Sequence, residues 1–163
     1  MKNTQKFITE IFDPETQSFE EIKEDILSIE HEAFGEHSFP DEWFPRDFCK
    51  EKENVVVLLR GPASKKVIGF TYAKPITNEK PDTAFIWNTA IQKNFQHQGL
   101  VGLLMETLEK ELMKRGFKYM EREAAYNNGY ADKIAKHYKG RIVEQSEPHE
   151  VFHDTQVFFR IKL

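Results

Sequence analysis

Residues 83–112 read TAFIWNTAIQKNFQHQGLVGLLMETLEKEL, and this stretch decides the fold. Its first ten residues are rich in β-branched and aromatic side chains, which predicts a strand over Thr83–Gln92. Leucines then follow at a spacing of four residues, from Leu100 to Leu112, and predict an amphipathic helix. A basic turn and a glycine at 115–116 end this helix. The stretch therefore predicts a strand that turns directly into a helix.

The turn itself, residues 91–102 (IQKNFQHQGLVG), has the composition of an anion site. The first N–H groups of a helix lack intrahelical acceptors and lie at the positive end of its dipole. Gly99 and Gly102 would let a pyrophosphate approach the backbone closely, and no carboxylate lies between Ile91 and Met105 to repel it. An ordinary tight turn would explain the same glycines without a ligand.

Outside this stretch the periodicity predicts a mixed architecture. Strands and helices alternate in the order β α α β β β α β α β β, with an antiparallel beginning and a later βαβ crossover. A capping box at Ser18–Glu21 opens the first helix, with Phe19, Ile22, Ile26, Ile29 and Ala33 on one stripe. The fold class is therefore α/β (α+β), with a mostly antiparallel sheet of about seven strands and about four helices. The boundaries expected for the other elements are strands at 6–12, 54–60, 67–75, 117–125, 141–145 and 156–163, and helices after Pro40 and at 130–139.

Length and composition indicate one globular domain over residues 1–163. The single cysteine, Cys49, cannot form an intramolecular disulfide, which fits a reducing compartment. The longest strongly apolar run, Val55–Leu59, has five residues, far short of the 20 or so that cross a bilayer. The first ten residues carry no signal-peptide pattern. We therefore expect a cytoplasmic protein without a membrane partner.

The net charge of −4 gives no reason to expect a nucleic-acid partner. The charge is unevenly distributed, because residues 1–54 carry −9 and residues 55–163 carry +5. A ligand that spans both parts would experience opposite fields, although solvated helix faces would give the same pattern. The closing strands allow a homodimer, but nothing in the sequence demands one.

The turn resembles the pyrophosphate loop of the GNAT superfamily of acyl-CoA-dependent N-acetyltransferases. That family has Q/R-x-x-G-x-G/A, and this chain has Gln96-His97-Gln98-Gly99-Leu100-Val101, followed by Gly102. Val101 departs from the pattern, since a small residue is usual there. The order of elements also resembles the GNAT order over essentially the whole chain.

The resemblance implies a V-shaped splay between the fourth and fifth strands, into which the pantetheine arm of acetyl-CoA inserts. Parallel strands that separate leave N–H and C=O groups unpaired, and pantetheine amides can satisfy them. By resemblance, Thr89, Ala90 and Ile91 offer backbone groups to pantetheine, and residues 96–102 hold the pyrophosphate. Asn127 and Asn128 resemble the family's CoA-contacting Asn, although Asn-Asn-Gly is also an ordinary turn signal.

The resemblance further implies a tyrosine that protonates the thiolate leaving group. Tyr138 is the candidate and Tyr130 the second choice, although both would also form a packed helix face with Ile134. The predicted fourth strand, Thr83–Ile91, contains no ionisable side chain, so it offers no general base. Glu121 and Glu123 share one face of the fifth strand and could reach the cleft, but no base is assigned.

Residues 149–153 (HEVFH) match H-E-x-x-H, the helical zinc signature of metalloproteases. Pro148 precedes the motif, and the ten residues after it contain no His, Glu or Cys to complete a zinc site. We therefore expect a strand end or loop here, and no metal cofactor.

The acceptor side of this fold is usually walled by the first two helices, and acidic residues there point to a cationic amine. We therefore expect acetyl transfer to a primary amine of a small molecule or peptide. A GNAT-fold module that binds acyl-CoA without turnover is the alternative, and a purely structural protein is a third reading. The acidic residues are Glu30, Glu32, Glu36, Asp41, Glu42 and Asp47, and the aromatic side chains near them are Phe34, Phe39, Trp43 and Phe44.

Overall fold

The computed structural model describes residues 6–63, 65–76 and 78–163. The chain forms two compact units. The first unit runs to Ala73 and includes Asn88–Glu111, and the second unit comprises Lys74–Trp87 and Leu112–Leu163. β3, β4 and α3 each contribute residues to both units.

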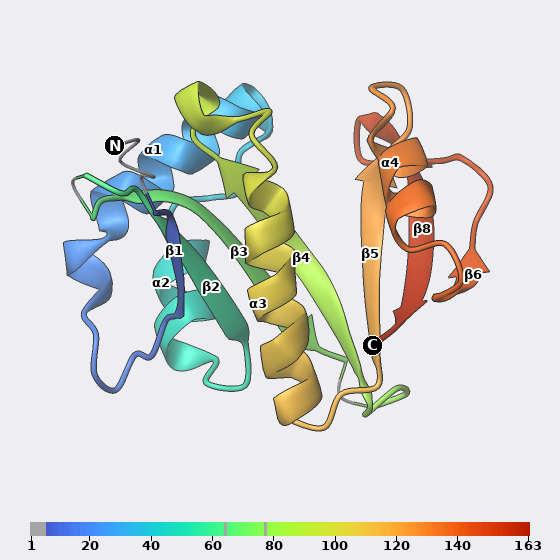
Figure 1. The fold of residues 1–163 in the computed structure, drawn as a ribbon, viewed down its shortest axis with the longest axis horizontal. Helices are drawn as coiled ribbons and strands as arrows, with labels where there is room; N and C mark the ends of the chain where they lie inside the picture. The colour runs from blue at the N-terminus through green and yellow to red at the C-terminus, as the bar shows by residue number, and fades with distance from the viewer. Residues whose placement is uncertain (1–5, 64, 77) are drawn as a thin grey trace. The chain divides into compact units, whose positions relative to one another are not determined.

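Eight strands form one sheet in the order β1-β2-β3-β4-β5-β8-β6, and β7 also pairs with β8 (Figure 1). The observed pairings are antiparallel except for β4 with β5, which is parallel. The mixed, mostly antiparallel sheet is therefore confirmed, with one strand more than expected. The strands are β1 (Ile8–Ile11), β2 (Val55–Arg60), β3 (Val67–Pro75), β4 (Thr83–Ile91), β5 (Tyr119–Ala125), β6 (Ile142–Gln145), β7 (His149–Val151) and β8 (Asp154–Lys162).

The helices follow the predicted order, with short 3₁₀ and π segments between them. Ser18 makes no side-chain capping bond, so the expected capping box is wrong. A 3₁₀ turn occupies Phe19–Glu21 instead, and the α-helix begins only at Lys23. The helices are α1 (Lys23–Phe34), α2 (Trp43–Pro45), α3 (Leu100–Lys114) and α4 (Tyr130–His137), with 3₁₀ turns at Phe19–Glu21, Gly35–His37 and Lys93–Phe95 and a π-helical turn at Arg46–Lys50.

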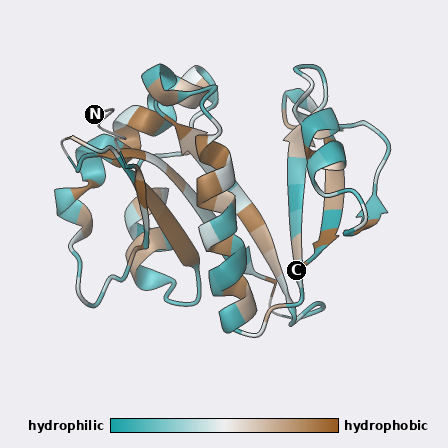
Figure 2. Cartoon of the chain, viewed as in Figure 1, coloured by the Kyte–Doolittle hydropathy of each residue, from teal (hydrophilic) through white to brown (hydrophobic). Residues whose placement is uncertain are grey.

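The core of the first unit lies between β2, β3 and the helical segment before β2. β2 is hydrophobic along most of its length (Figure 2). Because strand side chains alternate between faces, Val56 and Leu58 pack with one set of residues while Val57 and Leu59 face the other way. Ala33, expected on the buried stripe of α1, is exposed. The buried cluster contains Phe12, Phe19, Ile22, Ile26, Ile29, Phe44, Phe48, Val56, Leu58, Val67, Phe70, Tyr72 and Ala90.

The second unit is built on β5 and β8, which pair over the full length of β5, from Tyr119↔Lys162 to Ala125↔Gln156. β4 pairs with β5 in parallel only from Thr83↔Tyr119 to Phe85↔Glu121. Both strands continue beyond the last of these pairs. A parallel pair that stops early is what the predicted splay requires.

Residues 149–153 do not form the helix that a zinc protease motif needs. His149 and Glu150 belong to β7, and the chain turns at Phe152, where φ is +56°, into β8. Within the described ranges, no three His, Cys, Asp or Glu side chains gather closely enough to hold a metal ion. The short β7–β8 hairpin was not predicted, because its three residues carry no distinct alternation.

Among the described helices, none has both the length and the apolar character needed to cross a membrane.

Replacing Leu104 with alanine should destabilise the protein by about 2–5 kcal/mol, because the side chain is fully buried on α3 and its loss leaves a cavity. Leu103 is 38% exposed on the same helix, so Leu103→Ala is the matched control and should cost less than about 1 kcal/mol. Urea unfolding of both variants measures the difference. Equal losses would contradict the assigned face of α3.

His149 of β7 should titrate above its ordinary pKa of 6.5. The Glu147 carbonyl that contacts Nδ1 raises the pKa of His149, and the Glu123 carboxylate, 3.3 Å from Nε2, raises it further. Because the folded-state pKa is raised, the stabilisation is complete below pH 6.5 and is lost as pH rises through the folded-state value.

NMR titration of the His149 ring measures this pKa directly. Glu123→Gln should lower it, and His149→Gln should remove this part of the pH dependence of stability. A wild-type value at or below 6.5 would refute the assignment.

Candidate active site

The turn between β4 and α3 lies within the first unit and is held in an unusual backbone conformation. His97 and Gly99 have φ of +63° and +74°, a left-handed region that glycine adopts freely and histidine rarely. The Gln96 side chain donates from Nε2 to the Ile91 carbonyl at 2.9 Å. This bond ties the turn to the last residue of β4, and it gives the Ile91 carbonyl one partner already.

Five successive backbone N–H groups in this turn, those of residues 97–101, have no intramolecular acceptor within the described parts of the chain. The next N–H, of Gly102, bonds to the Gly99 carbonyl at 3.2 Å. These free donors include the first positions of α3, where the helix dipole also favours an anion. The arrangement is suited to phosphate oxygens.

The space over the turn is open. A Cβ built on Gly99 or Gly102 would meet no atom within 4 Å, and both residues are exposed. Val101 is half-buried at the position where the family motif has a small residue. The glycines, the unpaired donors and the absence of a carboxylate in the 91–105 sequence together fit a pyrophosphate group.

Thr89 and Ala90, the other residues expected at pantetheine, lie on β4 just before the turn. The Thr89 and Thr71 hydroxyls are 2.8 Å apart, and Thr71 also donates to the Asn88 carbonyl at 3.0 Å. Gly69 on β3 was not predicted to matter here. A Cβ on Gly69 would lie 3.1 Å from the Ala90 carbonyl oxygen, so the glycine permits the close approach of the two strands. An isolated glycine inside a predicted strand was the available signal.

The remaining predicted residues belong to the second unit. The Asn128 side chain accepts from the Tyr130 N–H at 3.0 Å, and Gly129 has φ of +79°, so the expected turn is confirmed. Asn127 and Asn128 are both exposed. Their contact with CoA stays a prediction.

The two candidate tyrosines lie at opposite ends of α4. Tyr138 caps its C-terminal end and is only 1% exposed, with the Arg141 guanidinium 5.0 Å from the ring centroid. Tyr130 begins α4 and is half-buried, and its hydroxyl accepts from Arg122 at 3.2 Å. Each tyrosine therefore lies beside an arginine, and the two differ in burial, since Tyr138 is almost fully buried and Tyr130 only partly.

The two glutamates of β5 differ in environment. Glu121 is 3% exposed and forms ion pairs with Arg160 and Lys80, so it is committed to the fold and is not available as a base. Glu123 accepts from His149 through Oε1. Its Oε2 is buried and has no hydrogen-bond partner in the described part of the protein.

The acidic residues expected to face the acceptor separate into two groups. Glu30 and Asp47 are buried. Asp47 accepts from Arg46 Nε at 2.8 Å and from the Tyr72 hydroxyl at 3.0 Å, so its charge is neutralised inside the fold. Burial raises the pKa of Glu30, opposed by its hydrogen bonds to Phe39 and Asn88. The exposed members of the set are Glu32, Glu36, Asp41 and Glu42, of which Asp41 pairs with His31 at 2.8 Å and Glu36 with His37 at 3.7 Å.

The aromatic residues near these helices divide similarly. Phe44 is fully buried core, Phe39 stacks on Trp43 with ring centroids 5.5 Å apart, and Phe34 is 38% exposed. Of these four residues, only Phe34, Phe39 and Trp43 are exposed enough for a ligand to contact them.

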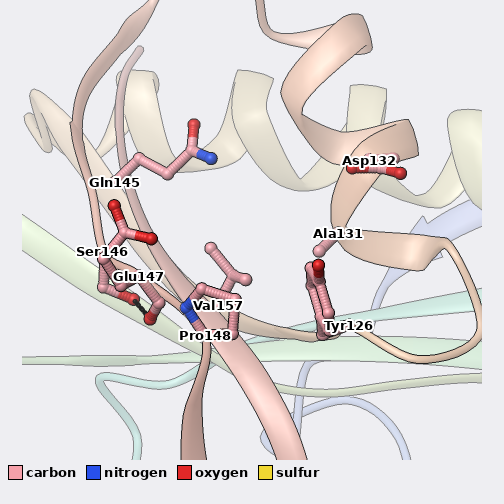
Figure 3. A pocket seen from close by; sticks show the side chains of 8 residues that line it. All are labelled: Tyr126, Ala131, Asp132, Gln145, Ser146, Glu147, Pro148 and Val157. Atoms are coloured by element: carbon pink, nitrogen blue, oxygen red, sulfur yellow. Dashed lines mark hydrogen bonds between the residues drawn. The ribbon is translucent and has the colours of Figure 1, made fainter.

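A hollow on the second unit is lined by none of the predicted site residues, although Tyr126 and Ala131 of its lining adjoin Asn127 and Tyr130 in the chain. Asp132 of α4 faces the segment 145–148 across it (Figure 3). Its lining residues are Tyr126, Ala131, Asp132, Gln145, Ser146, Glu147, Pro148 and Val157.

The solved structures with a similar fold include several acetyltransferases. The ribosomal-protein-S18-alanine N-acetyltransferase of Escherichia coli is 17% identical, with a TM-score of 0.72 over 96% of this chain and 94% of that one. Arabidopsis thaliana NAA60, in complex with a bisubstrate analogue, is 14% identical, with a TM-score of 0.74 over 97% and 99%.

Diaminobutyrate acetyltransferase EctA from Paenibacillus lautus, in complex with L-2,4-diaminobutyric acid and coenzyme A, is 11% identical. Its TM-score is 0.71 over 97% of this chain and 95% of that one. A search of curated protein sequences found no significant match.

The sequence model of the acetyltransferase (GNAT) family matches residues 19–137, which include α1, all of β2–β5, the turn at 91–102 and α4. The match runs through residues of both compact units. The chain therefore belongs to the GNAT family and is an acyl-CoA-dependent acetyltransferase.

Proposed function

We propose that this protein transfers the acetyl group of acetyl-CoA to a primary amine of a cationic small molecule or peptide. The observation that carries the proposal is the run of five unpaired N–H donors at residues 97–101, beneath the open space over Gly99 and Gly102. These groups would hold the pyrophosphate. Thr89–Ile91 would bind pantetheine, and Asn127 and Asn128 would also contact CoA.

The acceptor class is supported by charge. Residues 1–54 carry −9, and Glu32 and Glu42 remain exposed near the first helices. A negative surface raises the local concentration of an ammonium ion. Similar proteins act on amines, namely the alanine of ribosomal protein S18 in one case and L-2,4-diaminobutyric acid in another. We further propose that the protein is cytoplasmic, because its single cysteine, Cys49, is free. We also propose that residues 1–163 act as one catalytic domain.

The reaction needs a neutral amine and a protonated leaving group. The amine nitrogen forms a bond to the thioester carbon, the carbon–sulfur bond then breaks, and sulfur takes a proton. We propose Tyr138 as the donor of that proton. Water can accept the proton of the amine, and no side chain is assigned as base.

A panel of amines assayed for release of free CoA thiol tests the activity. Polyamines, amino sugars and peptides with a free N-terminus should be acetylated faster than neutral or anionic acceptors. Saturable acetyl-CoA binding without thiol release across the panel would instead indicate a binding module.

Gly102→Leu should fold normally but bind acetyl-CoA at least tenfold more weakly. The free space around Gly102 accommodates a side chain, and leucine is the better helix former by up to about 1 kcal/mol. The same side chain would occupy the space proposed for the pyrophosphate. Lys110→Leu, on an exposed position two turns along α3, is the control.

Thermal unfolding and calorimetric titration of both variants give the two readouts. Undiminished affinity of a folded Gly102→Leu protein would argue against the proposed phosphate site.

Tyr138→Phe should lower kcat by about 10²–10⁴-fold with little change in KM, because phenylalanine keeps the buried ring and removes only the proton donor. Steady-state kinetics with the best acceptor measures this. Tyr130→Phe serves as the comparison. If Tyr130→Phe shows the loss and Tyr138→Phe does not, Tyr138 is not the acid.

A further inference from the structure

Glu30 is a buried carboxylate for which the described residues provide no ion pair. Three carboxylates are buried among the described residues, and they are Glu30, Asp47 and Glu121. Arg46 pairs with Asp47, and Arg160 and Lys80 pair with Glu121. Glu30 is 1% exposed and forms no ion pair with any Lys, Arg or His in the described ranges. An unpaired buried charge is costly, so its presence calls for an explanation.

The two oxygens of Glu30 accept from neutral donors. The Phe39 backbone N–H donates to Oε1 at 2.9 Å, and Asn88 Nδ2 donates to Oε2 at 2.7 Å. The neutral amide of glutamine could also accept from Phe39. Holding residues 38–39 therefore does not require a charge at this position.

The contact with Glu30 sets the orientation of Asn88. The NH₂ group of Asn88 faces Glu30 and its Oδ1 faces away. A carboxylate that keeps its charge only accepts hydrogen bonds, and it therefore favours this orientation. The Asn88 backbone is also held, because its carbonyl accepts from Thr71. No donor from the described residues contacts Asn88 Oδ1, and this atom is not among those cut off from solvent. Asn88 thus presents one oriented, unused acceptor.

The position of Asn88 places this acceptor next to the proposed thioester site. Asn88 directly precedes Thr89–Ile91, where pantetheine is proposed to bind. Its side chain reaches α1, through Glu30, on the face of β4 that also buries Ala90 in the cluster with the helices. That is the side on which the acceptor is expected.

We propose that Asn88 Oδ1 receives the primary amine of the acceptor, and that Glu30 is a positioning residue that orients Asn88 and favours a cation there. This inference rests on the proposed acetyl transfer and names the residues that select its substrate. An amine that donates one N–H to Oδ1 is held in place while its lone pair stays free to attack. The negative charge of Glu30 favours binding of the substrate as an ammonium ion, which must lose one proton to water before its lone pair can attack the thioester carbon.

Glu30→Gln separates this role from a structural one. The introduced amide would direct its own NH₂ at Asn88, so Asn88 would turn its Oδ1 inward and present NH₂ to the acceptor. The KM for the amine should rise at least tenfold, with the KM for acetyl-CoA within twofold of wild type. The melting temperature should be unchanged or higher, because an unpaired buried charge is removed.

Two further variants serve as a second test and as a control. Asn88→Ala removes the acceptor atom and should raise the KM for the amine by a similar factor. Glu24→Gln makes the same charge change on an exposed position of α1 and should alter neither KM. If Glu30→Gln leaves the KM for the amine unchanged while wild type turns over, the inference is overturned and the proposed function stands.

Binding is measured separately from turnover. The side-chain amide signal of Asn88, identified by its absence from Asn88→Ala, is followed by NMR during titration with the best acceptor of the panel. If no amine releases CoA, 1,4-diaminobutane is the probe. A saturable shift of the signal supports the inference even when acetyl transfer fails, and no shift overturns it.

Discussion

The site depends on one constraint, which is that the backbone leaves β4 and enters α3 without pairing the N–H groups of residues 97–101. Donors of this kind are stable only where water or a ligand satisfies them. The positive φ of His97 and Gly99 directs the chain into this conformation, and the bond from Gln96 to Ile91 holds it there. In the proposed function, the turn would provide an anion site that is formed in advance of its ligand. Such pre-organisation reduces the entropy lost on binding.

The three buried carboxylates differ in whether a cation of the protein pairs with them. Asp47 pairs with Arg46, and Glu121 pairs with Arg160 and Lys80, in each case within the same unit. These pairings stabilise local structure and leave little field outside. Glu30 differs because neutral donors surround it. Its field remains available to a substrate. The net charge of residues 1–54 is therefore a poor guide to the substrate until carboxylates that pair with a cation inside the fold, such as Asp47, are distinguished from those that do not, such as Glu30.

Sequence patterns predicted the fold where periodicity was strong. β3 has its expected boundaries, and α3 begins at Leu100 as its leucine spacing indicates. Predictions failed where tertiary contacts outweighed local signals. Ser18 has the sequence of a capping residue, yet the chain forms a 3₁₀ turn there and buries Phe19. β7 has three residues and exists because β8 pairs with it.

In the candidate site, too, local features were predicted from the sequence and long-range contacts were not. The turn between β4 and α3 follows from the glycine spacing, because glycine conformation is a local property, and its role in binding phosphate stays a prediction. The environment of Glu30 was not predictable, because it depends on Asn88, 58 residues away in the chain. The same holds for Asp47, whose partner Tyr72 lies 25 residues on. Pairings of this range are set by the packing of α1 and the π-helical turn against the sheet.

The most direct measurement of the central claim is an ¹⁵N-¹H NMR titration of the protein with coenzyme A. The account predicts that the backbone amides of residues 97–101 shift together and saturate, and that they become protected from hydrogen exchange. Binding of the coenzyme that leaves these five amides unshifted and exchanging at their original rates would contradict it.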